Sequence, residues 1–119
     1  MQSKKVYFVS GIDTDAGKSV VTGLLARDMN ARNERTITQK FIQTGNTGIS
    51  EDIELHRRIM GIPLQEVDLD GTTCQIIFTY PSSPQLAAEI DHREIDLSLV
   101  EKSTAKLLES YDTVLLEGA

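Results

Sequence analysis

Four short segments of the sequence carry the hydrophobic pattern of β-strands. Residues 6–9 and 113–116 are continuous apolar runs, which predicts strands buried on both faces. Residues 36–42 alternate moderately between apolar and polar side chains, and residues 73–80 predict a further strand. Loops that contain glycine or proline, and longer polar stretches, separate these segments.

Apolar residues at helical spacing lie between the predicted strands. A helix is predicted over residues 18–31, where one face contains Val21, Leu24, Leu25 and Met29. A second helix is predicted to begin after Ser50, because serine is a favoured N-cap and acidic side chains follow it at the positive end of the helix dipole. Gly61 and Pro63 end this helix, and its predicted buried face contains Leu55, Ile59 and Ile62.

Two more helices are predicted later in the sequence. A rigid turn over residues 81–84 precedes a short helix over residues 85–90, and Asp96 or Ser98 caps the last helix. One face of that helix contains Val100, Thr104, Leu107 and Leu108.

Strands that alternate with helices are typical of a parallel sheet with helices packed on it. We therefore predict an α/β fold with a parallel sheet and flanking helices. A buried strand needs neighbours on both sides, yet the most apolar strand comes last in the sequence. We expect residues 1–119 to be the N-terminal part of a single larger domain.

Composition and charge narrow the function classes. The 119 residues include 12 Lys and Arg against 18 Asp and Glu, a formal net charge of −6. This surplus of acid argues against broad binding to nucleic acid or to an anionic membrane, since both require a basic field. The sequence shows no secretory or membrane-spanning segment and a single cysteine, so we expect a cytoplasmic protein.

The turn between the first predicted strand and helix has the composition of a phosphate-binding loop. It runs Gly11-Ile-Asp-Thr-Asp-Ala-Gly-Lys-Ser19. A helix N-terminus offers a phosphate unpaired backbone N–H groups and a partial positive charge. Gly17 would let the backbone approach the phosphates, Lys18 would neutralise them, and the Ser19 hydroxyl would bind Mg²⁺. Five residues separate the two glycines, whereas the usual P-loop has four.

Other candidate site residues follow the ends of predicted strands. Lys40 is followed by Thr44 in a glycine-rich loop, and Glu117 ends the last strand. Ligands of open parallel sheets bind at the carboxyl ends of the strands, where we expect Lys18, Lys40, Thr44 and Glu117 to converge. Taken alone, Lys40 fits a surface lysine equally well, and Asp52 fits a helix-dipole acid better than a metal ligand.

The two histidines and the cysteine are expected to play structural parts. His56, His92 and Cys74 lack the spacing of a zinc site. We predict that the histidines lie at the surface or in packing contacts. Cys74 has no activating cation near it in the sequence, so we place it in the core.

Taken together, these motifs resemble those of the dethiobiotin synthetase family. The family's P-loop has an extra residue, in the pattern Gly-x-Asp-Thr-x-x-Gly-Lys-Thr, and residues 11–19 match it with Ser19 in place of threonine. The resemblance runs in order along the whole chain. Its further matches are Lys40 with Thr44-Gly45, Asp52, Pro81-Ser-Ser-Pro84 and Glu117-Gly-Ala119.

The resemblance implies a P-loop NTPase-like fold and an ATP- and Mg²⁺-dependent cyclo-ligase of biotin biosynthesis, a homodimer when full length. Its substrates would be 7,8-diaminononanoate and CO₂ or bicarbonate. A carbamate of the diamine attacks the γ-phosphate of ATP, and the neighbouring amine then attacks the resulting mixed anhydride. The cyclic urea of dethiobiotin forms, with release of ADP and phosphate.

The resemblance also implies a role for each candidate residue. Lys40 and Lys18 would be catalytic, because they would stabilise negative charge on carbamate and phosphoryl oxygens. Thr14 and Thr44 would help to bind substrate. The Mg²⁺ ligands would be Ser19, Asp52 and Glu117. The nucleotide would be bound by Asp15, Ala16, Gly17, Lys18, Ser19, Val20, Asp52 and Glu117.

Two other functions are associated with similar P-loops. Partition and septum-positioning ATPases, which work by ATP-driven dimerisation, carry a signature lysine four residues before the glycine of Gly-Lys. Asp13 holds that position here, which argues against this class. Amidoligase-type relatives act on corrinoid carboxylates but normally have a long additional glutaminase domain. Lys40 followed by Thr44 favours the synthetase.

Overall fold

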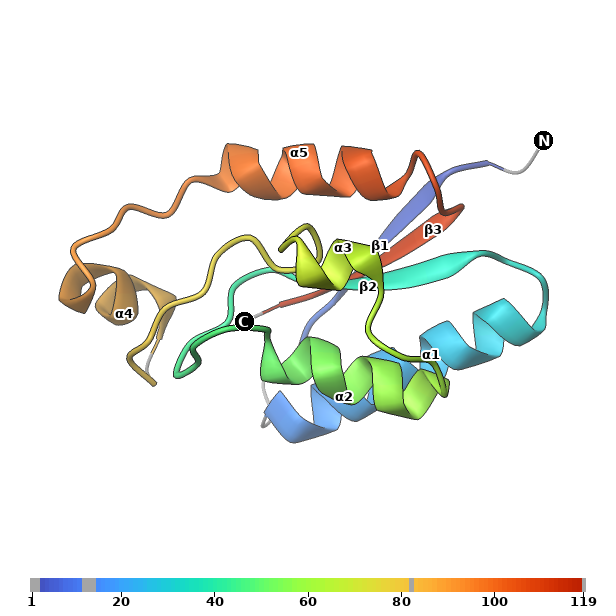
Figure 1. Cartoon of the computed structure of the whole chain (residues 1–119), viewed down its shortest axis with the longest axis horizontal. Coiled ribbons are helices and arrows are strands. Elements are labelled where there is room, and N and C mark those ends of the chain that lie inside the picture. The colour runs from blue at the N-terminus through green and yellow to red at the C-terminus, as the bar shows by residue number, and fades with distance from the viewer. Residues whose placement is uncertain (1–2, 12–14, 82, 119) are drawn as a thin grey trace.

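Three parallel strands form the central sheet of the computed structural model, which describes residues 3–11, 15–81 and 83–118 (Figure 1). They are β1 (Lys5–Val9), β2 (Thr36–Lys40) and β3 (Thr113–Glu117), in the order β1-β3-β2. β3 pairs in parallel with both of the other strands, although it lies far from them in the sequence. The predicted parallel sheet is confirmed.

Helices pack on both faces of this sheet. α1 (Asp15–Ala31) and α2 (Glu51–Met60) lie together on one face, and α5 (Leu97–Leu107) lies along the other (Figure 1). Two short helices, α3 (Glu66–Leu69) and α4 (Pro84–Ile90), occupy the segment between α2 and α5; α3 was not predicted. Among the described residues, no helix has the length and apolarity needed to cross a bilayer.

The alternation of side chains along β3 determines which residues reach each helical layer. Leu115 packs against Met60 of α2, whereas Val114 packs against Leu107 of α5. Successive side chains of a strand point to opposite faces. Glu117, two residues beyond Leu115, therefore lies on the face that α1 and α2 cover.

α1 approaches the sheet with small residues rather than with its large apolar ones. The predicted helix is confirmed, but Val21, Leu24 and Leu25 are exposed. The buried stripe consists of Ser19, Thr22, Gly23 and Ala26. A Cβ atom on Gly23 would lie 3.0 Å from the Ile59 Cβ atom of α2, so glycine permits the close approach of the two helices.

α2 begins and ends as predicted, but its buried face differs. The Ser50 side chain accepts a hydrogen bond from the Ile53 backbone N–H, and Gly61 ends the helix in the left-handed conformation with φ 74°. The predicted inner residues Leu55, Ile59 and Ile62 are only half-buried. The buried residues are Ile53, His56, Arg57 and Met60.

The strand predicted over residues 73–80 is wrong. This segment makes one isolated bridge, between Gln43 and Ile77, in place of a continuous ladder. Its side chains still alternate, since Cys74, Ile76 and Phe78 are buried. Its longer-range backbone hydrogen bonds join it to Lys40 at the end of β2 and to Gln43 and Asn46 in the loop beyond. β2 itself ends at Lys40 rather than at residue 42.

β1 is also less buried than its apolar sequence predicts. Val6, Tyr7 and Phe8 are each 45–57% exposed. β1 is an edge strand and pairs only with β3 among the described strands. Its sequence pattern correctly predicts a strand. How deeply that strand is buried depends on the elements packed beside it, which the pattern does not specify.

Candidate active site

Lys40 and Glu117 end neighbouring strands and meet at the carboxyl edge of the sheet. They are register partners in the β2–β3 pair, so their side chains lie on the same face. Both are almost fully buried, and the Lys40 Nζ atom donates hydrogen bonds to Glu117 Oε2 and to the Gly118 backbone oxygen, each at 3.0 Å. A buried lysine held in this way is not the surface lysine that the sequence alone left open.

Helices α1 and α2 add three side chains to this pair. The Ser19 hydroxyl donates to Glu117 Oε2 at 3.0 Å, and the Asp52 Oδ2 atom lies 2.7 Å from the Lys40 ammonium. His56 Nε2 lies 2.9 Å from the second oxygen of Glu117, Oε1. We call Ser19, Lys40, Asp52, His56 and Glu117 the edge cluster.

The loop after β2 holds the first turn of α2, and this turn positions Asp52. The Gln43 Oε1 atom accepts hydrogen bonds from the Ser50 hydroxyl at 2.6 Å and from the Asp52 backbone N–H at 3.4 Å. One side chain from the sheet edge thus holds the first turn of the helix. Gln43 was not predicted as a site residue, since a single glutamine in a loop carries no recognisable signal.

The electrostatics of the edge cluster favour the charged forms of Glu117 and Lys40, but not that of Asp52. Burial acts to raise the pKa of Glu117, but the hydrogen bond with His56 and the charge of Lys40 outweigh it and lower the pKa to about 2. Burial acts to lower the pKa of Lys40, but Asp52 and Glu117 outweigh it and raise the pKa. Asp52 keeps a raised pKa because of burial, and Lys40 offsets this only in part. One ammonium is thus shared by two carboxylates.

The low pKa of Glu117 predicts a defined pH dependence of stability. A carboxyl whose pKa falls from 4.5 to about 2 on folding stabilises the protein above pH 4.5 and loses that contribution as the pH falls through 2. The contribution is on the order of 3 kcal/mol. We expect Glu117→Gln to lower the free energy of unfolding at pH 6, and the difference from wild type to shrink toward pH 2.

Urea unfolding of wild type and of Glu117→Gln between pH 6 and 2 measures this difference. Other carboxylates with lowered pKa values, such as Asp70 and Asp96, are present in both proteins and cancel in it. A difference that is constant over this pH range would contradict the assignment.

The donor atoms of the edge cluster fit Mg²⁺. Ser19, Asp52 and Glu117 offer oxygen atoms, the type that Mg²⁺ prefers. Asp52 Oδ2 is buried and makes no directed hydrogen bond within the described residues, only the ion pair with Lys40. In the described part of the chain, no three His, Cys, Asp or Glu side chains are arranged to hold a metal alone.

The structure gives fewer contacts for the remaining predicted site residues. Asp15 to Val20 form the first turns of α1, with Lys18 half-buried directly before Ser19 and Val20 exposed. Thr14 lies outside the described residues. Thr44 is half-buried in the loop after β2, and no hydrogen bond or ion pair of the described residues joins its side chain to the edge cluster.

His56 lies at the centre of the site, although the sequence predicted only a surface or packing role for it. It is fully buried and in direct contact with Glu117. A signal for this was present, since residues 53, 56, 57 and 60 have the spacing of a single helix face. Cys74 is buried as predicted, and burial raises the pKa of its thiol to about 12. His92 is exposed, also as predicted.

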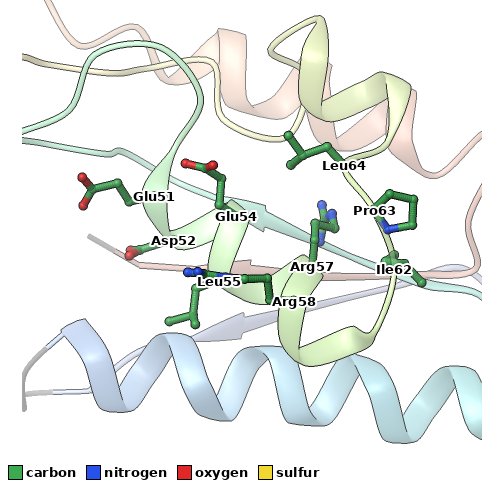
Figure 2. A pocket seen from close by; sticks show the side chains of 9 residues that line it. All are labelled: Glu51, Asp52, Glu54, Leu55, Arg57, Arg58, Ile62, Pro63 and Leu64. Atoms are coloured by element: carbon green, nitrogen blue, oxygen red, sulfur yellow. The ribbon is translucent and has the colours of Figure 1, made fainter.

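A pocket of about 640 Å³ lies beside the edge cluster, along α2 and the segment that follows it. Figure 2 shows three acidic side chains from the start of α2 on this pocket, Glu51, Asp52 and Glu54, and Arg57 directed toward the loop that carries Leu64. Asp52 belongs to both the pocket and the edge cluster. The volume of the pocket is within the range of small-molecule sites.

Parallel strands, flanking helices and a buried polar cluster at the carboxyl edge define a P-loop-type α/β domain. A family model described as an AAA domain matches residues 5–119, and the chain belongs to this family.

Curated relatives are similar over almost the whole chain. Proteins named ATP-dependent dethiobiotin synthetase BioD or BioD 2 are 58% identical in Chlorobaculum tepidum, 53% in Haemophilus influenzae and 51% in Pasteurella multocida. These matches cover 96–97% of this chain but 48%, 60% and 54% of the respective relatives. The chain thus spans about half the length of the curated relatives it matches, and the resemblance to the dethiobiotin synthetase family is confirmed.

Proposed function

We propose that the full-length protein is an ATP-dependent dethiobiotin synthetase that forms the cyclic urea of dethiobiotin from 7,8-diaminononanoate, CO₂ and ATP. The observation that carries this proposal is the buried Lys40 ammonium shared by Asp52 and Glu117 at the carboxyl edge of the sheet. Its support is the similarity to relatives of that name. Phosphoryl transfer needs mainly positioning and charge neutralisation.

In this proposal, each residue of the chain has a defined task. Backbone N–H groups at the start of α1 bind the phosphates, and Lys18 neutralises the charge on the γ-phosphate as the carbamate oxygen attacks it. Lys40 stabilises the carbamate and the phosphoryl oxygens while ADP leaves. The second amine of the substrate then attacks the carbonyl carbon, and phosphate leaves. Thr14 and Thr44 hold the substrate.

Ser19, Asp52 and Glu117 would hold a Mg²⁺ ion, which would neutralise charge on the phosphates when bound. The two carboxylates supply two negative charges, and the serine hydroxyl supplies a neutral ligand. A homodimer and a cytoplasmic location stay predictions.

The proposal predicts a cyclic urea whose carbonyl carbon comes from bicarbonate. Full-length protein is incubated with diaminononanoate, ¹³C-bicarbonate, Mg²⁺ and each nucleoside triphosphate in turn, and the products are analysed by mass spectrometry. We expect dethiobiotin that is heavier by about one mass unit than the product made from ordinary bicarbonate.

Two matched reactions complete this experiment. The product is expected to disappear when EDTA removes Mg²⁺, and also when the Asp52→Asn variant is used in place of the wild-type protein. Nucleotide hydrolysis without formation of the labelled urea would overturn the proposed substrate, and would leave a P-loop ATPase of another kind.

A further inference from the structure

We propose that His56 is a positioning residue, which holds one oxygen of the Glu117 carboxylate so that the other oxygen faces Ser19 and Lys40. The two oxygens have separate partners in the structure. His56 Nε2 contacts Oε1 at 2.9 Å, and Ser19 Oγ and Lys40 Nζ both contact Oε2 at 3.0 Å. The inference rests on the proposed function, because Oε2 is the oxygen on the side of the other proposed Mg²⁺ ligands.

The proton positions around His56 follow from a chain of buried hydrogen bonds. The Arg57 Nη1 group donates to Thr38 Oγ1 at 2.7 Å, and Thr38 Oγ1 lies 2.7 Å from His56 Nδ1. Since the threonine hydroxyl accepts from Arg57, its own proton is available to Nδ1. On the other side of the ring, Nε2 faces Oε1 of a carboxylate, which can only accept, so Nε2 carries the proton that is donated to Glu117.

Arg57 anchors this chain to the protein interior. Its Nε and Nη2 groups donate to the two Asp68 carboxylate oxygens at 2.8 Å each, and Nη2 also donates to the Thr38 backbone oxygen at 3.1 Å. Arg57 and Asp68 are both buried, so this bidentate pair is rigid and poorly screened. The order Asp68, Arg57, Thr38, His56, Glu117 thus joins a fixed ion pair to the edge cluster.

The positions of Thr38 on β2 and of His56 on α2 direct both side chains toward the edge cluster. Thr38 is two residues before Lys40 on β2 and therefore points to the same face of the sheet. His56 is four residues after Asp52 on α2, so one helix face presents both side chains to Glu117 and Lys40. Residues that orient a metal-binding side chain typically contribute a factor of about 10–100 in metal affinity.

The first test compares two substitutions of His56 in the full-length protein. Leucine fills a similar space without a donor, whereas the amide of glutamine places an N–H group close to the position of Nε2. Mn²⁺ is titrated by electron paramagnetic resonance into protein saturated with a non-hydrolysable ATP analogue. His56→Leu is expected to raise the Kd for Mn²⁺ by about 10–100-fold, and His56→Gln to restore most of the affinity.

The Kd for ADP in the presence of EDTA separates positioning from general damage. We expect His56→Leu to change it by less than about threefold, because the metal-free nucleotide does not depend on Oε2. His92→Gln, at an exposed histidine, is the matched control and is expected to match wild type in both measurements. Equal Mn²⁺ affinity in wild type and His56→Leu would overturn the inference.

A second measurement needs neither metal nor nucleotide. In ¹H–¹⁵N spectra of metal-free wild type, Nε2 of His56 is expected to carry a proton that is hydrogen-bonded to Glu117. Absence of a proton on Nε2 would overturn the inference, even if His56→Leu fails to fold, because Nε2 could then not donate to Glu117. Absence of Mn²⁺ binding by wild type with nucleotide would instead overturn the proposed function, while the spectrum still tests His56.

Discussion

Replacing Lys18 by alanine is expected to lower ATP turnover by the full-length protein by at least about a hundredfold. Lys18 lies in the first turns of α1, directly before Ser19, whose hydroxyl is hydrogen-bonded to Glu117. A lysine at this point of a P-loop reaches the β- and γ-phosphates. Removing a single group that stabilises transition-state charge typically costs about 10²–10³ in rate.

Steady-state release of phosphate measures this effect, and the Kd for ATP shows how much of it arises in binding. Lys102→Ala is the matched control, because Lys102 is an exposed helical lysine far along the chain on α5. It is expected to retain wild-type turnover. Full turnover by Lys18→Ala would show that the P-loop prediction is wrong.

The sequence predicts the elements of this fold better than it predicts their contacts. Strand and helix patterns correctly located β1, β2, β3, α1, α2, α4 and α5, because local periodicity, caps and glycine stops are encoded within each segment. The strand predicted over residues 73–80 failed for a different reason. Its alternating burial is real, but a ladder also needs a partner that remains extended, and β2 ends at Lys40.

The faces of the two helices near the site show the same limit. α1 buries small residues around Gly23, because its close contact with α2 leaves no space for the larger Val21 or Leu24. α2 buries His56 and Arg57, because they have partners in Glu117, Thr38 and Asp68. Hydrophobicity alone places such side chains at the surface, and only the three-dimensional partners make their burial favourable.

The meeting of the site residues was predictable from topology. Parallel strands end at one edge, so Lys18, Lys40, Thr44 and Glu117 were expected to converge. The structure brings Lys40 and Glu117 together with Ser19 and Asp52, whereas no hydrogen bond or ion pair of the described residues joins the Thr44 side chain to them. Residues that act through hydrogen bonds to other site residues, Gln43 and His56, were missed. Gln43 carries no signal in the sequence. The helical spacing of His56 places it on the buried face of α2, but its contact with Glu117 depends on a distance across the fold that the spacing does not give.

Replacement of Lys40 by methionine is expected to have the largest combined effect on rate and stability. Methionine keeps most of the apolar volume of the side chain and removes only the ammonium. Turnover should fall by about 10²–10³, the usual effect of losing one group that stabilises transition-state charge. Without metal, the variant should also lose about 3–5 kcal/mol of stability, because two carboxylates are left without their shared cation.

The pH dependence of the Lys40→Met protein gives this prediction a definite sign. Burial already raises the pKa of Asp52, and the variant loses the lysine that opposes the shift. A carboxyl with a raised pKa in the folded state destabilises the protein above that pKa and ceases to do so as the pH falls through it. Urea unfolding should therefore show Lys40→Met gaining stability relative to wild type as the pH falls from 7 toward 3.8, the ordinary pKa of aspartate.

The double variant Lys40→Met with Asp52→Asn separates folding from catalysis. It removes one of the two unpaired carboxylates and leaves Glu117 with its hydrogen bonds to His56 and Ser19. We expect it to recover at least about half of the lost stability, because the energetic cost comes from like charges that face each other without a cation. It should remain inactive, since both the charge of Lys40 and a proposed metal ligand are gone. Recovery of turnover together with stability would show that Lys40 serves the fold and not the reaction.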